Sequence, residues 1–105
     1  MRFVETPIFT RVLTRLIADD EYRSLQIALM LRPDQGPIIS GTGGLRKVRW
    51  ARPGAGKRGG FRIIYYWAPK GQAFYMLYVY AKNEQGDLTH AQARWLGQLV
   101  REEFK

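Results

Sequence analysis

The chain has 105 residues and no cysteine, and its 17 lysines and arginines against 9 acidic residues give a net charge of +8. This length predicts one domain with one core, residues 1–105. The lack of thiols excludes disulfides, a cysteine-containing zinc site and a thiol nucleophile. No apolar run approaches the roughly 20 residues of a membrane span, and the first residues lack the apolar core of a signal peptide, so we expect a soluble, cytoplasmic protein.

The chain begins with signals for a short strand and a helix. Residues 2–5 can form the strand. Thr6 followed by Pro7 is typical of a helix start, because the hydroxyl can cap free amides and proline fits the first turn. Apolar residues at spacings of three and four then predict one buried helix face, made of Phe9, Val12, Leu13, Leu16 and Ile17.

A second helix and a loop are predicted next. Asp19 or Asp20 is expected to cap this helix, and Pro33 is expected to end it, because proline disfavours helix in the residue before it. Its apolar contacts are expected from Tyr22, Leu25, Ile27, Leu29 and Met30. Residues 33–44 are rich in glycine and proline, which indicates a loop that leads to a sheet.

Three strands are predicted after this loop. Residues 45–50 alternate, which places Leu45, Lys47 and Arg49 on one side and Arg46, Val48 and Trp50 on the other. The glycine- and arginine-rich segment 52–60 predicts an exposed basic loop. Segments 61–67 and 73–80 are rich in β-branched and aromatic residues, and the turn signal between them predicts an antiparallel hairpin.

The last predicted element is a helix, and it completes an α+β fold. Thr89 and Gln92 have the spacing of a capping box. An apolar stripe follows for the sheet or a partner, formed by Trp95, Leu96, Leu99, Val100 and Phe104. The expected architecture is a small, mostly antiparallel sheet, made of a short N-terminal strand and a C-terminal three-stranded meander, with an N-terminal helical hairpin and a C-terminal helix.

The positive charge is concentrated in one interval of the sequence. No acidic residue lies between Asp34 and Glu84, and that interval carries Arg46, Lys47, Arg49, Arg52, Lys57, Arg58, Arg62, Lys70 and Lys82. Such a local surplus is typical of a surface that meets phosphates, and interleaved aromatic residues can stack on bases or fill a core. The alternative is a solvated basic face without a partner.

Other kinds of site find little support in the sequence. The glycine-rich segment 54–58 lacks the spacing and hydroxyl of a phosphate loop. The single histidine, His90, is expected in the first turn of a helix in a surface or capping role. Glu84 and Asp87 flank a glycine and are expected to form a turn, not to bind a metal. We therefore expect no metal and no cofactor.

Cations and phenols can nevertheless cleave RNA. They can position a 2′-hydroxyl and stabilise the pentacovalent phosphorane. A lysine crowded by arginines can act as a base, whereas arginine keeps its charge and suits phosphate binding. Backbone contact without chemistry is the alternative for each cation.

Three segments resemble RelE-type toxins, with the closest likeness to the HigB branch. They are Gly43-Gly44-Leu45-Arg46-Lys47-Val48-Arg49, Lys57-Arg58-Gly59-Gly60-Phe61-Arg62-Ile63-Ile64-Tyr65-Tyr66 and Tyr78-Val79-Tyr80-Ala81-Lys82-Asn83-Glu84. The resemblance covers nearly the whole chain. It implies a toxin of a bacterial type II toxin–antitoxin pair, a ribosome-dependent endoribonuclease (mRNA interferase) that cuts mRNA in the ribosomal A site and so inhibits translation.

The resemblance also implies roles for individual residues. Lys47 and Arg49 match two basic strand residues, one a candidate base and the other a phosphate ligand, and Arg62 matches an arginine that stabilises the transition state. Lys82 matches a lysine after the last strand. The next position, often an arginine that protonates the leaving group, is here Asn83.

A second departure concerns the tyrosine that stacks on the substrate base in RelE, which would fall near Leu88 and Thr89. The nearest substitutes for the missing groups are Lys82, Tyr66 or Tyr80. Further contacts to RNA or the ribosome are expected from Arg46, Arg52, Lys57, Arg58, Tyr66, Tyr80 and Asn83.

The partners that the resemblance implies are the 70S ribosome with mRNA and a helix-turn-helix, HigA-like antitoxin, with operator DNA reached only through the antitoxin. Two other functions use the same cations. One is a noncatalytic RNA- or DNA-binding module, and the other is a co-repressor that acts on the operon with the antitoxin.

Overall fold

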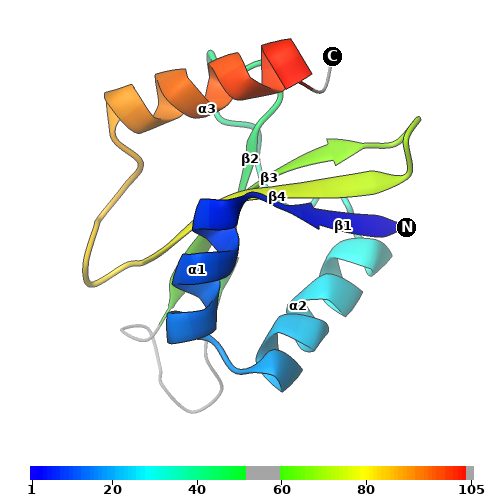
Figure 1. The fold of residues 1–105 in the computed structure, drawn as a ribbon, viewed down its shortest axis with the longest axis vertical. Coiled ribbons are helices and arrows are strands. Elements are labelled where there is room, and N and C mark those ends of the chain that lie inside the picture. The colour runs from blue at the N-terminus through cyan, green and yellow to red at the C-terminus, as the bar shows by residue number, and fades with distance from the viewer. Residues whose placement is uncertain (52–59, 104–105) are drawn as a thin grey trace.

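The protein folds as a four-stranded sheet with helices on both faces (Figure 1). A computed structural model describes residues 1–51 and 60–103. The elements in chain order are β1 (Arg2–Glu5), α1 (Pro7–Leu16), α2 (Asp19–Leu31), β2 (Arg46–Trp50), β3 (Phe61–Ala68), β4 (Ala73–Ala81) and α3 (His90–Glu103). The sheet order is β1-β4-β3-β2, in which β1 runs parallel to β4 and the other pairs are antiparallel. The predicted α+β architecture is confirmed.

Two predicted helix caps are present. The Thr6 hydroxyl accepts a hydrogen bond from the Phe9 amide at 3.1 Å, and Pro7 occupies the first turn of α1. At the start of α3, the Thr89 hydroxyl accepts from the Gln92 amide, and the Gln92 side chain accepts from the Thr89 amide, each at 3.0 Å. Both helices therefore begin where the sequence predicted.

The cap predicted for the second helix was wrong in detail. Ala18 is the N-cap of α2 and provides no side-chain hydrogen bond, whereas Asp19 and Asp20 lie within the first turn. Carboxylates there still stabilise the helix, because they face the partial positive charge of its amino terminus. The helix ends at Leu31, ahead of Pro33, as expected.

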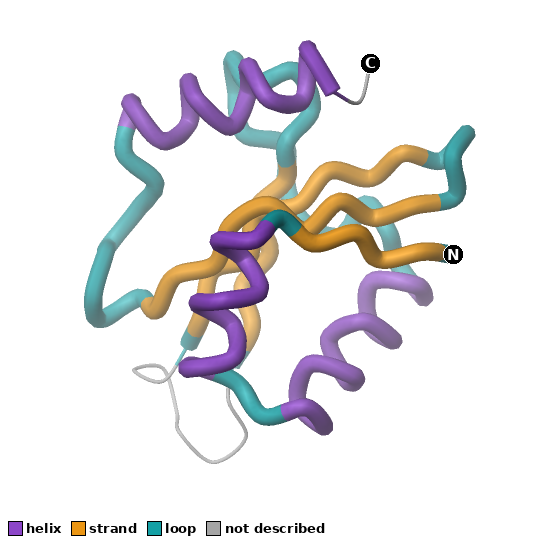
Figure 2. Tube along the Cα trace, in the orientation of Figure 1, coloured by secondary structure: helices purple, strands orange, loops and turns teal. Residues whose placement is uncertain are grey.

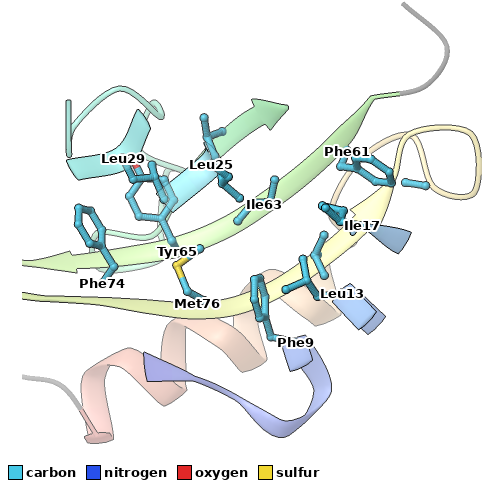
Figure 3. Packing of buried hydrophobic residues seen from close by; sticks show 13 residues of the cluster. Phe9, Leu13, Ile17, Leu25, Leu29, Phe61, Ile63, Tyr65, Phe74 and Met76 are labelled. Atoms are coloured by element: carbon cyan, nitrogen blue, oxygen red, sulfur yellow. The ribbon is translucent and has the colours of Figure 1, made fainter. Parts of the chain in front are cut away.

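The larger core cluster lies between the sheet and helices α1 and α2. Figure 3 shows Phe9 and Leu13 of α1 and Leu25 and Leu29 of α2 against the sheet residues. The sheet side of this cluster is formed by Val48, Phe61, Ile63, Tyr65, Phe74, Met76, Val79 and Ala81. Of the face predicted for α1, Phe9 and Leu13 are buried, Val12 and Leu16 are partly buried, and the buried Ile17 follows the helix.

Helix α3 covers part of the opposite face (Figure 2). Leu96 and Val100 are buried against a second cluster that contains Leu45, Ile64, Leu77 and Tyr80. Trp95, although part of the predicted stripe, is exposed. Phe104, at the end of that stripe, lies outside the described residues.

A register shift in β4 changes which side chains face α3. Ile64 pairs with Tyr78, but Tyr65 pairs with Met76, so β4 contains one extra residue, Leu77. Leu77 and Tyr78 both belong to the cluster on the α3 side, whereas Met76 belongs to the opposite cluster. A single inserted residue reverses the alternation of all that follow, and it therefore brings Tyr80 to the α3 face.

The loop between α2 and β2 is fastened to the core and to the sheet edge. The buried Tyr65 hydroxyl donates to the Pro33 carbonyl at 2.8 Å and accepts from the Gly36 amide at 3.1 Å. Farther along, the Lys47 amide donates to the Pro37 carbonyl at 3.1 Å. Residues 33–39 thereby cover the first part of the exposed edge of β2.

Replacing Tyr65→Phe should lower the free energy of unfolding by about 1–3 kcal/mol, because the buried Gly36 amide loses its acceptor while the ring keeps its packing. Urea denaturation followed by far-UV circular dichroism measures this change. An unaltered midpoint would contradict the role given to this hydroxyl.

Candidate functional site: a cation-lined groove at the sheet edge

Three of the predicted catalytic cations lie on one face of two neighbouring strands. Arg49 of β2 pairs with Arg62 of β3, which in turn pairs with Tyr80 of β4. Directly paired residues project to the same face with Cα atoms about 5 Å apart. Lys47 lies two residues before Arg49 and therefore shares this face. We call Lys47, Arg49, Arg62 and Tyr80 the cation cluster.

Arg62 is the most buried cation of the cluster, with 8% of its surface exposed. Its Nη1 donates to the neighbouring Phe61 carbonyl at 3.4 Å, which is a long hydrogen bond. Within residues 1–51 and 60–103, no carboxylate forms an ion pair with it. The Asp87 carboxylate interacts with Arg62 electrostatically, but not through an ion-pair contact. A buried guanidinium is unfavourable for folding unless an anion compensates it, so this arrangement suits an anion that contacts Arg62 directly.

Tyr80 places a neutral phenol beside Arg62. Burial raises the pKa of the Tyr80 phenol, the Asp87 carboxylate raises it further, and the Arg62 guanidinium opposes the shift. The hydroxyl is buried and has no hydrogen-bond partner among the described residues. The nearby Leu88 amide does not satisfy it, because that amide donates to Asp87 Oδ1 at 2.8 Å. Tyr80 therefore offers an unused donor.

An acidic residue also reaches the cluster. Lys47 Nζ lies 3.1 Å from Asp87 Oδ1, although the two residues are 40 positions apart. The Leu88 amide and the Lys47 ammonium hold the pKa of the Asp87 carboxyl below its ordinary value. The sequence analysis gave Asp87 only a turn-forming role, since no local pattern links it to Lys47.

A groove of about 640 Å³ lies at the edge of β2, and two members of the cation cluster line it, whereas Arg62 and Tyr80 do not. Lys47, Arg49 and Asp87 line one part of it, and Pro37 and Ile38 line another. Arg32, which follows α2, adds a further cation. Arg32 was not predicted as a site residue, because it lies outside the interval between Asp34 and Glu84 that lacks acidic residues.

Of the remaining predicted residues, Arg46 and Tyr66 lie away from this cluster, and three loop cations lie outside the described residues. Arg46 lies on the opposite face of β2, where its Nη1 donates to the carbonyls of Asp34 and Gly36 at 3.1 and 2.9 Å. Tyr66 is four residues beyond Arg62 on β3, about 13 Å away along the strand. The loop cations Arg52, Lys57 and Arg58 are not among the described residues.

Lys82 and Asn83 follow the end of β4 and are exposed. The Lys82 amide donates to the Gly60 carbonyl at 3.1 Å, which extends the β3–β4 pairing by one residue. Of the three substitutes considered for the missing acid, Tyr80 pairs directly with Arg62, and Lys82 follows it by two residues on the same face.

The fold and site define a small α+β protein with a basic sheet face, and comparison with known proteins agrees. Residues 1–104 match the family described as RelE toxin of the RelE / RelB toxin–antitoxin system. The chain belongs to this family and is therefore a toxin of a toxin–antitoxin system, with an antitoxin as its partner.

A solved structure of E. coli toxin RelE, a mutant with two arginines replaced by alanine and in the free state, has the same fold. It shares 10% sequence identity, with a TM-score of 0.59, and the match covers 88% of this chain and 92% of that chain. The assignment to the HigB branch stays a prediction. Among the described helices, none is both long and apolar enough to cross a membrane.

Tyr80→Phe should leave the stability of the protein unchanged or raise it, because the substitution removes a buried hydroxyl that has no partner among residues 1–51 and 60–103. Its urea midpoint is to be compared with that of Tyr65→Phe, which loses two hydrogen bonds. A large drop for Tyr80→Phe would show that its hydroxyl stabilises the fold.

Stability should fall as the pH rises above 10. Burial raises the pKa of Tyr65 and Tyr80 above the ordinary value of 10.0, so the folded protein keeps protons that the unfolded chain releases. The contribution of these two tyrosines to the free energy of unfolding is complete below pH 10. It is lost as the pH rises towards the pKa values of the phenols in the folded protein. Unfolding midpoints between pH 8 and 11.5 test this, and the decline should be shallower for Tyr65→Phe relative to its own value at pH 8.

Proposed function

We propose that the protein is a ribosome-dependent endoribonuclease, an mRNA interferase that cuts mRNA in the ribosomal A site and thereby inhibits translation. The observation that carries this proposal is Arg62, a buried cation that forms no ion pair with the described residues and lies in one cross-strand row with Arg49 and Tyr80. Family membership supplies the biological setting of a toxin.

The proposed reaction is a metal-independent attack of a 2′-hydroxyl on the adjacent phosphodiester. The 2′-oxygen forms a bond to phosphorus, the bond to the 5′-oxygen breaks, and a 2′,3′-cyclic phosphate and a 5′-hydroxyl result. A base removes the 2′ proton, and an acid protonates the departing 5′-oxygen. Negative charge grows on the phosphorane oxygens, where fixed cations are most effective.

The cluster can supply these groups. Arg62, held by its burial, is proposed to stabilise the phosphorane, and Arg49, exposed on the edge strand, to bind the phosphate. Lys47 is the candidate base, since arginine cannot give up its proton. The Tyr80 phenol is proposed to protonate the leaving group, because it is neutral, lies beside Arg62 and has an unused donor.

The proposed partners are the 70S ribosome with its mRNA and a HigA-like helix-turn-helix antitoxin, which would also carry the toxin to operator DNA. A requirement for the ribosome fits the chemistry of the cluster. The cation cluster has no histidine, and its candidate base, Lys47, is paired with Asp87. Such a weak set of acid and base groups depends on precise placement of the RNA.

Arg62→Met should reduce A-site cleavage by about a hundred-fold or more, because it removes a fixed positive charge from the transition state. Its stability should be equal or higher, since an apolar chain of similar length replaces a buried cation that forms no ion pair in the described part of the chain. The measurement is primer extension on a defined mRNA in stalled 70S complexes, with ribosome-free RNA in parallel.

The matched control is Arg23→Ala, which removes an exposed arginine from α2 and should leave cleavage unchanged. A folded Arg62→Met protein that cuts at the wild-type rate would contradict the proposal. Binding to the ribosome without any cut by the wild-type protein would favour a noncatalytic RNA-binding module.

A further inference from the structure

The groove contains one acidic side chain among its cations. Of the residues that line it, Arg32, Lys47 and Arg49 are positive, and Asp87 is negative. Asp87 lies outside the acid-free interval of the sequence and is brought to the groove by the loop between β4 and α3. A surface meant to attract polyanions gains nothing from this charge by itself, so the position of Asp87 calls for another explanation.

The loop holds this carboxylate in place through several hydrogen bonds. Asp87 Oδ1 accepts from the Leu88 amide at 2.8 Å and from Lys47 Nζ at 3.1 Å. The Asp87 carbonyl accepts from Gln85 Nε2 at 2.8 Å. Gln85 Nε2 also donates to the side chain of Gln92, which caps α3. The carboxylate is therefore positioned by the same contacts that start the last helix.

Stability does not account for the Lys47–Asp87 ion pair. The two side chains are 29% and 74% exposed, and ion pairs this accessible to water are weak. A weak pair can be exchanged readily for a stronger ligand. Its effect on a ligand is nevertheless direct, because the Asp87 oxygen occupies a position where a phosphate oxygen would accept from Lys47, and the two anions repel each other.

We propose that Asp87 stands in for an RNA phosphate on Lys47 and thereby sets the affinity and selectivity of the groove. An arriving phosphate must displace the carboxylate from Lys47. An RNA that makes one or two contacts with the groove binds poorly because of this competition. An RNA held by additional contacts displaces the Asp87 carboxylate from Lys47. The identity of the displaced ligand as RNA rests on the proposed function.

The test uses a fluorescein-labelled 2′-O-methyl RNA hexanucleotide, which cannot be cleaved because its 2′-oxygens are blocked. Fluorescence anisotropy at fixed ionic strength gives its dissociation constant for the full-length protein. Asp87→Asn should bind about three- to five-fold more tightly, the upper part of the range expected when one exposed charge contact is removed. Asparagine keeps an oxygen that can accept from the Leu88 amide, so the loop should retain its structure.

Glu84→Gln is the matched control, because it removes an exposed acid from the same loop but not from the groove. Its affinity should stay within about two-fold of wild type, since exposed charges outside the site are screened by salt. If Asp87→Asn folds poorly by circular dichroism, Asp87→Ser takes its place, as its hydroxyl can also accept from the Leu88 amide.

A double-mutant cycle assigns the effect to Lys47. In the Lys47→Met background, Asp87→Asn should give a smaller gain, because the competition for Lys47 is absent and only the repulsion between Asp87 and the phosphate remains. The inference is overturned if Asp87→Asn binds like wild type or more weakly, if Glu84→Gln gains as much, or if the gain is as large without Lys47 as with it.

Cleavage is measured separately, so this inference and the proposed function can fail independently. Tighter RNA binding by Asp87→Asn, without A-site cuts by any variant, would support the inference about Asp87 and contradict the proposed endoribonuclease function. A-site cuts that depend on Arg62, together with unchanged RNA binding by Asp87→Asn, would support the proposed endoribonuclease function and overturn the inference about Asp87. Slower cleavage at unchanged affinity would also overturn it, because Asp87 would then act in the reaction.

Discussion

The extra residue in β4 is the constraint on which the site depends. A regular strand from Ala73 to Ala81 would place Tyr80 on the face of α1 and α2, because side chains alternate with a period of two. The shift at Ile64 and Tyr65 moves it to the face of Arg62 instead. The same shift leaves Met76 and Val79 in the larger core. One inserted residue thus serves both the packing of the helices and the composition of the cation cluster.

Arg62 shows how this fold divides its sheet between stability and function. The inner strand β3 is buried from Phe61 to Tyr65, and its apolar residues join both core clusters. A guanidinium in such a strand is unfavourable unless an anion reaches it. Tyr80, next to Arg62, is a second buried polar group in this sheet, and its hydroxyl has no hydrogen-bond partner among the described residues.

The groove is assembled from three segments that are distant in the sequence. The loop after α2 covers the first part of the β2 edge, β2 supplies Lys47 and Arg49, and the loop before α3 supplies Asp87. Covering part of the edge limits unwanted pairing with other chains. It also leaves the cation-bearing half of β2 open. Tyr65 connects this arrangement to the core through its two hydrogen bonds to the loop.

The sequence by itself determined the order and type of the elements, because the signals involved are local. The caps of α1 and α3, the stop of α2 before Pro33 and the alternation in β2 each depend on neighbours within a few residues. The three segments that resemble RelE-type toxins also predicted the family from the sequence.

Tertiary structure alone decided which charged residues meet. Arg49 meets Arg62 through the strand register, Tyr80 joins them through the inserted residue, and Asp87 reaches Lys47 across 40 residues. Arg46 bonds to backbone carbonyls on the other face, although it lies next to Lys47 in sequence. Composition counts charges along the chain, but the pleat and register of a sheet decide their distances in space.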